Sequence, residues 1–184
     1  MKKLMLLVAT LALLLPLGAA PAIADRLGDS HGDPHRPKSV SLHGTGGLTL
    51  SLPGYDGDPV RFTVDAHGPR NNPMAARGTF HVTHHRPDGS LLAEFSGTVD
   101  CLMSGGGTSV VTGVITEGSL HGIPDAPDVV GVHIGLTVVD GHRRDHIGWS
   151  WLVAGFEDVP PCTGTAPIFS VTEGGYRLRG DTQL

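Results

Sequence analysis

The chain has 184 residues, with 27 glycines, 14 prolines and only 5% aromatic residues. So much glycine and proline excludes a helical bundle, and the absence of a repeat excludes collagen. The formal net charge of −5 argues against binding to nucleic acid or to an anionic membrane surface, because both need basic patches. The length allows one globular domain.

The first 24 residues have the pattern of an export signal. Lys2 and Lys3 provide the positive start, an apolar run follows at 4–17, and Ala22 and Ala24 form the small-x-small pattern of a signal peptidase site. The run is shorter than the roughly 20 residues that cross a bilayer. We therefore expect a signal peptide at 1–24 and a secreted, extracellular protein with no membrane span, whose net charge falls from −5 to −7 when the two lysines are removed.

The expected mature chain has two parts. Residues 25–38 are polar, interrupted by proline and glycine, and without apolar periodicity, which predicts a disordered tail. From residue 39 onward, short stretches of alternating apolar residues are broken at regular intervals by turn residues. This pattern is typical of an all-β protein, so we expect a single β-domain over 39–184.

The expected strands follow from β-branched content and from the turn residues between them. Gly44 to Gly47 predict a hairpin turn after the first strand, and Pro87-Asp88-Gly89 predict another tight turn. Antiparallel hairpins of this kind form either a small β-barrel or a two-sheet β-sandwich of about eight strands, and the pattern favours neither. The expected strands are 39–43, 48–52, 60–67, 78–85, 91–102, 109–117, 129–140, 145–154 and 168–172.

Two cysteines, Cys101 and Cys162, follow the export signal. An even cysteine count in an oxidising compartment predicts a disulfide. It would close a loop of about 60 residues, which stabilises the fold by roughly 4 kcal/mol in the chain-entropy model. Within the 91–102 strand, alternation places Phe95, Val99 and Cys101 on one face.

Several β-strand and turn segments of the chain resemble a family of secreted actinobacterial proteins often labelled repetin. The resemblance covers about residues 60–172 and implies secretion, a β-fold and a cysteine pair. It implies no activity and brings no catalytic residue with it. The segments are RFTVDAH (61–67), ARGTF (76–80), VDCL (99–102), VTGVIT (111–116), GVHIGLTV (131–138), IGWSW (147–151), PC (161–162) and AP (166–167).

The two tryptophans, Trp149 and Trp151, lie on one face of a predicted strand with apolar neighbours. Two large rings in such a setting usually fill a core. In a barrel with a hollow interior they would instead line a cavity for a small apolar ligand, together with Phe95.

The eleven histidines are the one unusual feature of the composition. Ligands of one metal on a strand must lie two residues apart to share a face and still reach the ion. His81, His84 and His85 fall in one predicted strand but do not have this spacing. A site shared between strands would draw on His67, His81 or His85, and a looser one on His142 and His146 beside Asp140 and Asp145. The alternative interpretation is that histidine replaces lysine as a polar surface residue.

No residue pattern supports catalysis. Ser150 lacks the second glycine of the Gly-x-Ser-x-Gly turn, and cysteines in a disulfide cannot act as nucleophiles. We therefore expect a non-enzymatic, extracellular binding module or a structural module of the cell envelope, without a cofactor and with an unidentified extracellular or envelope partner. The alternatives are a carrier of a small apolar ligand and a histidine-based metal-binding protein.

Overall fold

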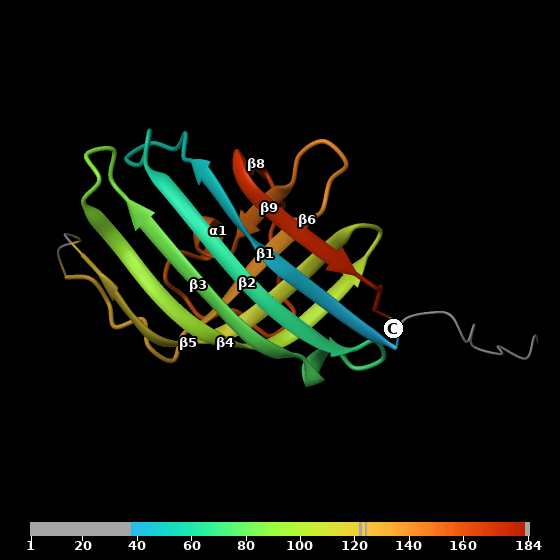
Figure 1. The fold of residues 1–184 in the computed structure, drawn as a ribbon. Coiled ribbons are helices and arrows are strands. Elements are labelled where there is room, and N and C mark those ends of the chain that lie inside the picture. Colours follow the sequence, from blue (N-terminus) through green and yellow to red (C-terminus); the bar gives the residue numbers. More distant parts are fainter. Residues whose placement is uncertain (1–37, 122, 124, 183–184) are drawn as a thin grey trace, which may run out of the picture. The chain divides into compact units, whose positions relative to one another are not determined.

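The computed structural model describes residues 38–121, 123 and 125–182. The predicted signal peptide and all but the last residue of the predicted tail lie outside these residues. Nine antiparallel strands form one sheet in the order β8-β7-β6-β5-β4-β3-β2-β1-β9, which curls into a half-barrel (Figure 1). The prediction of an all-β antiparallel fold is confirmed, and the strands belong to a single continuous sheet.

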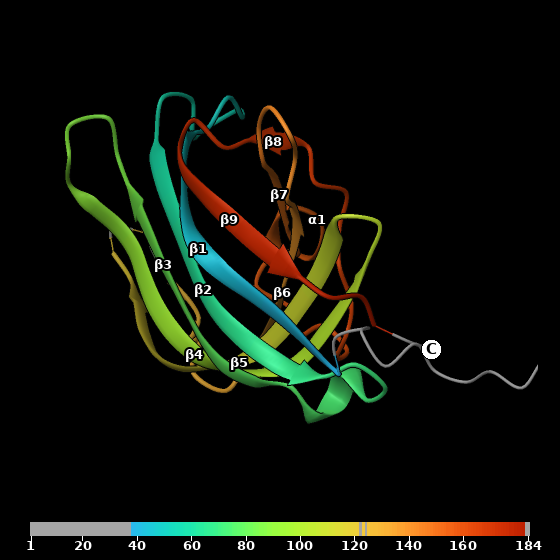
Figure 2. The same cartoon turned by 45° about the vertical axis from the view of Figure 1, so that its right-hand side comes forward.

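The strands differ widely in length. The elements are β1 (Ser39–Thr49), β2 (Pro59–Pro69), the 3-10 helix η1 (Pro73–Ala75), β3 (Arg77–His85), β4 (Leu91–Gly105), β5 (Thr108–Leu120), β6 (His133–Val139), β7 (His146–Trp149), the short helix α1 (Trp151–Ala154), β8 (Phe169–Ser170) and β9 (Glu173–Arg179). Figure 2 shows the sheet curling from β3 and β4 round to β6 and β7.

The curl brings strands far apart in the sheet order face to face across the core. The ring centre of Phe62 on β2 lies 5.3 Å from that of Trp149 on β7, and Phe95 on β4 lies 5.8 Å from the same indole. Phe80 on β3 packs against the backbone of Gly97 and Gly113, where a Cβ atom would collide with its ring. Glycine at these two positions thus lets a large ring approach the backbone of the bent sheet closely.

The predicted hairpin at Gly44 to Gly47 is wrong. β1 runs through all four residues and pairs with β2 on one side and β9 on the other. A Cβ on Gly46 would lie 2.6 Å from the ring of Tyr176, whose hydroxyl donates a hydrogen bond of 2.9 Å to the Phe62 carbonyl. The glycines therefore make room for a tyrosine from β9, instead of turning the chain.

Three further strand predictions are corrected. The predicted 145–154 strand ends at Trp149, where the chain turns into α1, and the predicted 129–140 strand begins only at His133. The predicted 168–172 strand shrinks to the two residues of β8. The sequence interpretation missed β9, which contains three polar or charged residues and two glycines among its seven residues.

A bulge in β4 changes the direction of the Cys101 side chain. Val99 pairs with Gly113 and Cys101 with Thr112, so Asp100 is an extra residue on β4. The alternation reverses at a bulge of this kind. Val99 belongs to the core inside the sheet, whereas Cys101 does not, and the prediction that they share a face is wrong.

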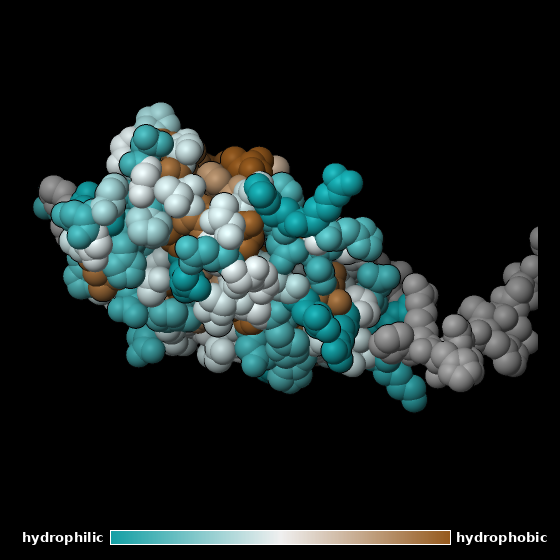
Figure 3. Space-filling model, turned by 45° about the horizontal axis from the view of Figure 1, so that its top comes forward, coloured by the Kyte–Doolittle hydropathy of each residue, from teal (hydrophilic) through white to brown (hydrophobic). Residues whose placement is uncertain are grey.

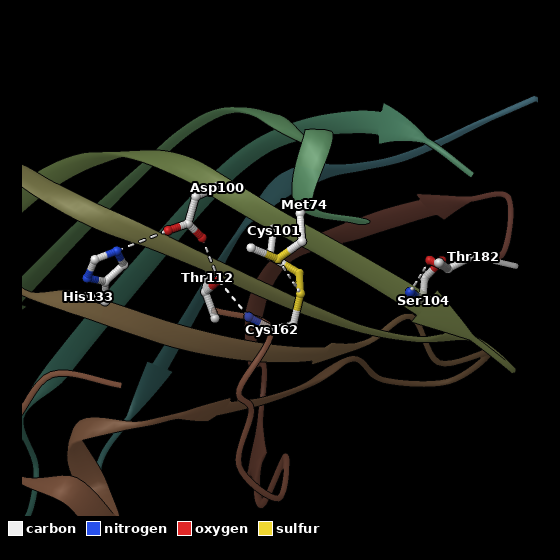
Figure 4. Close-up of a disulfide and its surroundings, with 8 residues drawn as sticks. All are labelled: Met74, Asp100, Cys101, Ser104, Thr112, His133, Cys162 and Thr182. Carbon is white, nitrogen blue, oxygen red and sulfur yellow. Dashed lines mark hydrogen bonds and ion pairs between the residues drawn. A yellow bond between two sulfur atoms is a disulfide. The ribbon is translucent and has the colours of Figure 1, made fainter. Parts of the chain in front are cut away.

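The predicted disulfide between Cys101 and Cys162 is present, with the two Cα atoms 5.4 Å apart (Figure 4). The backbone N–H of Cys162 also donates a 3.0 Å hydrogen bond to the Thr112 hydroxyl, which in turn donates to the carboxylate of Asp100 over 2.6 Å. The next residue along the segment, Thr163, lies so close to Gly135 on β6 that a Cβ atom on this glycine would collide with the Thr163 carbonyl. The disulfide, this hydrogen bond and the close packing hold the segment around Cys162 against the outer face of β4, β5 and β6.

The edge of β9 that faces away from β1 is covered by two carboxylates from the loop between β6 and β7. Asp145 accepts a 2.6 Å hydrogen bond from the backbone N–H of Tyr176, and Asp140 accepts one of 2.8 Å from Leu178. Side chains thus satisfy backbone donors that a neighbouring strand would otherwise satisfy. Covered edges of this kind protect a sheet from pairing with other chains.

Candidate functional site

The candidate site is an apolar cavity of about 330 Å³ inside one end of the half-barrel. At this end β1, β3 and β5 finish and β4 begins. The loop that follows β1 contributes Leu52, Pro53 and Tyr55 to its wall. Hydrophobic side chains also come to the surface at the upper end of the molecule, among hydrophilic ones (Figure 3).

Most of the wall consists of aliphatic and aromatic side chains. The lining residues are Leu48, Leu50, Leu52, Pro53, Tyr55, Phe62, His84, Leu92, Ala93, Leu120, Ile123, Ile147, Trp149, Trp151, Leu152, Phe156 and Phe169. This composition, with very few polar groups, is typical of a site for a small apolar molecule.

The predicted ligand-lining residues lie together at this cavity. Trp149 and Trp151 both line it, and their rings stack with centres 5.4 Å apart. Phe95 lies behind them, 5.1 Å from Trp151, and supports the wall without lining it. The turn from β7 into α1 produces the stack, because it folds Trp151 back beside Trp149.

A buried, hydrogen-bonded pair of side chains, Asp58 and His84, was not predicted from the sequence. His84 Nε2 lies 2.7 Å from Asp58 Oδ2, and the two residues are 6% and 4% exposed. The ring of Tyr55 covers His84 at 5.5 Å between centres. Alternation along β3 places His84 on the same face as Phe80 and Val82, and that signal could have identified it as buried.

Burial lowers the pKa of His84 below its ordinary value, because the charged imidazolium loses its hydration inside the protein. The hydrogen bond and negative charge of Asp58 act in the opposite direction, and the electrostatic interactions with Arg86 and His85 add to the lowering. Desolvation is the largest of these effects, so burial favours the neutral imidazole over its charged form at this site. The contact between the two side chains is then a hydrogen bond between a neutral imidazole and a carboxylate.

This pKa shift predicts a pH dependence of stability. The unfolded chain takes up a proton at His84 at a higher pH than the folded chain does, so the free energy of unfolding falls as the pH is lowered from 7.5 to 5. The double variant Asp58→Leu/His84→Phe should lose part of this decrease. Urea unfolding at both pH values measures it, and an equal decrease in the variant and the wild type would contradict the prediction.

The structure does not bring the predicted metal ligands together. His67 pairs with Arg77 in the β2–β3 register, so His81 lies four positions along β3 from that pair and His85 eight. Four positions correspond to about 13 Å, too far for two ligands of one ion. Among the described residues, no group of three or more His, Cys, Asp or Glu side chains is placed to hold a metal.

His81 and the two acids of the looser candidate site, Asp140 and Asp145, have identifiable partners. His81 hydrogen bonds to Ser96 over 2.8 Å and lies 3.4 Å from the Glu94 carboxylate. His142 is exposed and His146 half-buried. The carboxylates of Asp140 and Asp145 beside them are occupied by the backbone of β9.

Comparisons with protein-family models, with curated proteins and with solved structures found no match. The resemblance to the proteins labelled repetin therefore stays a prediction. No helix in the described part of the chain has the length and apolar character needed to cross a bilayer.

Proposed function

We propose that this protein is an extracellular binding protein for a small apolar molecule, which occupies the cavity beside Trp149 and Trp151. The single observation that carries the proposal is the cavity of about 330 Å³, walled almost entirely by apolar side chains. Apolar side chains that face water are energetically unfavourable. A ligand that fills the cavity gains van der Waals contacts with the wall and removes apolar surface from water.

The volume sets the size of the ligand. An engineered cavity of about 150 Å³ holds one benzene molecule, and this cavity is about twice as large. A molecule with two fused six-membered rings matches that space. The disulfide supports secretion of the folded domain, since such bonds persist in oxidising compartments, and the predicted signal peptide agrees with it.

Naphthalene is a suitable first probe because its two fused rings match the cavity. Equilibrium dialysis of the full chain should show saturable binding of one naphthalene per protein. The chain contains only two tryptophans, and both line the cavity, so tryptophan emission should change along the same saturation curve. Absence of binding by naphthalene and by other apolar molecules of this size would overturn the proposal.

A matched pair of substitutions locates the binding. Ala93 lines the cavity, whereas Ala66 is fully buried in the core outside it. Ala93→Leu should place three carbon atoms in the cavity, weaken naphthalene binding at least tenfold and leave the free energy of unfolding unchanged or higher. Ala66→Leu should lower the free energy of unfolding by about 1–3 kcal/mol through overpacking and leave the affinity within about twofold. Equal binding by Ala93→Leu and wild type would place the ligand elsewhere.

A further inference from the structure

The Asp58–His84 pair lies at the cavity wall, where it would be a strongly polar neighbour of an apolar ligand. His84 belongs to the cavity wall, and its side chain is only 8% exposed. Opposite it in the β3–β4 register is Ala93, which also lines the cavity. A titratable side chain in such an apolar wall fixes the orientation of a ligand more effectively than its apolar neighbours do.

Asp58 is held in place by its own backbone. Its N–H donates to the Tyr55 carbonyl over 3.1 Å, and its carbonyl accepts from Leu50 over 2.8 Å. The carboxylate therefore meets His84 in a fixed geometry, and it accepts a hydrogen bond from the N–H that the neutral imidazole carries on Nε2. The other ring nitrogen, Nδ1, is then left with a lone pair.

Nδ1 is the atom through which His84 can contact a ligand. Among the described residues, none forms a side-chain hydrogen bond to Nδ1. Nδ1 also differs from the sealed polar atoms of this part of the chain, which are closed off from solvent and have no hydrogen-bond partner. These are Ser109 Oγ, Trp149 Nε1, Trp151 Nε1 and Thr165 Oγ1. The two indole N–H groups are sealed, so they offer no donor to a ligand. Within the described part of the chain, the ring nitrogen of the wall that is neither sealed nor partnered is thus a hydrogen-bond acceptor.

We infer that the ligand is a small apolar alcohol or phenol, whose hydroxyl donates a hydrogen bond to His84 Nδ1 while its carbon skeleton lies against Trp149 and Trp151. The inference rests on the proposed function and adds the chemical class of the ligand. Asp58 acts as a positioning residue, because it keeps the proton on Nε2 and leaves Nδ1 as the acceptor. A ligand of the same shape without a hydroxyl leaves Nδ1 without a partner, which weakens its binding.

Three ligands of similar size separate the contribution of hydrogen-bond donation from that of apolar contact. Of these, 2-naphthol donates a hydrogen bond, 2-methoxynaphthalene only accepts one, and 2-methylnaphthalene does neither. Equilibrium dialysis of the full chain at pH 7.5 should show 2-naphthol binding about tenfold more tightly than each of the others, the effect of one net hydrogen bond. Equal affinities for all three would overturn the inference and leave the proposed function standing. Failure of all three to bind would overturn the proposed function itself.

Variants test whether His84 causes the preference. Asp58→Leu/His84→Phe replaces both partners with apolar groups, which avoids leaving a buried charge unpaired. It should bind 2-methylnaphthalene within about threefold of wild type and show no preference for 2-naphthol. Asp58→Asn keeps an acceptor for Nε2 and should retain the preference. A preference that survives in the double variant would place the hydroxyl elsewhere and overturn the inference.

His81→Phe is the matched control. His81 lies on the same strand as His84, but its partners are Ser96 and Glu94 and it does not line the cavity. The substitution should leave both the affinity and the preference for 2-naphthol unchanged. A lost preference in this variant as well would show that the histidine-to-phenylalanine change acts through the strand and not through the cavity, and would contradict the inference.

Discussion

Replacing Cys101 and Cys162 with alanine is expected to lower the free energy of unfolding by about 4 kcal/mol. The bridge joins residues 61 positions apart, and a cross-link that closes a loop of this length greatly restricts the unfolded chain. The bridge also acts in the folded chain. Cys162 has a φ of 62°, a left-handed conformation that a residue other than glycine rarely adopts, and the bridge holds the residue in it.

Urea unfolding of the double variant and of the wild type measures this effect. Wild type unfolded in the presence of a reducing agent is the control and should resemble the variant. The bridge lies on the outer face of the sheet, and neither cysteine lines the cavity, so naphthalene affinity should change less than twofold below the unfolding transition. A loss of stability under about 1 kcal/mol would show that the 160–166 segment is held by its other contacts.

Asp145→Ala is expected to lower the free energy of unfolding by about 3 kcal/mol. One carboxylate oxygen accepts the N–H of Tyr176 over 2.6 Å, and the other accepts the N–H of Gly141 over 3.0 Å. Tyr176 is only 7% exposed, so the substitution leaves a buried backbone donor without a partner. An unmade hydrogen bond of this kind costs about 1–3 kcal/mol, and bonds to a charged acceptor are at the upper end of the range.

Asp181→Ala is the control for the lost negative charge, because Asp181 is exposed and, within the described part of the chain, its only hydrogen bond uses its backbone carbonyl. It should change the free energy of unfolding by less than about 0.5 kcal/mol. Asp145→Asn keeps one acceptor oxygen and should lie between the two variants. Equal urea midpoints for Asp145→Ala and Asp181→Ala would show that the carboxylate does not stabilise β9.

Hydrophobic alternation was a good guide wherever one face of a strand is apolar and the other polar. It located β2, β3, β4 and β5 within a few residues, because burial on one side requires a period of two. It failed at Gly44 to Gly47 and at β9. Both segments are rich in glycine or polar residues, and contacts with each other, not their own side chains, hold them in the sheet.

The residues of the candidate site also fall into two groups, those that the sequence could identify and those that only the structure brings to the cavity. Trp149, Trp151 and Phe95 could be selected from the sequence because large aromatic residues among apolar neighbours are buried in most proteins. Asp58 and His84 are 26 residues apart, and Asp58 lies in a turn whose polar sequence resembles any exposed loop. Only the path of the chain after β1 brings this carboxylate to the end of β3.

By itself, the sequence determined the all-β class, most of the strands and the pairing of the two cysteines, because each depends on local periodicity or on a count. The tertiary structure alone decided the single curled sheet, the carboxylates that cover β9 and the cavity with its buried Asp58–His84 pair. These features arise where residues distant in the chain meet, and their energies depend on burial and geometry, which no local pattern encodes.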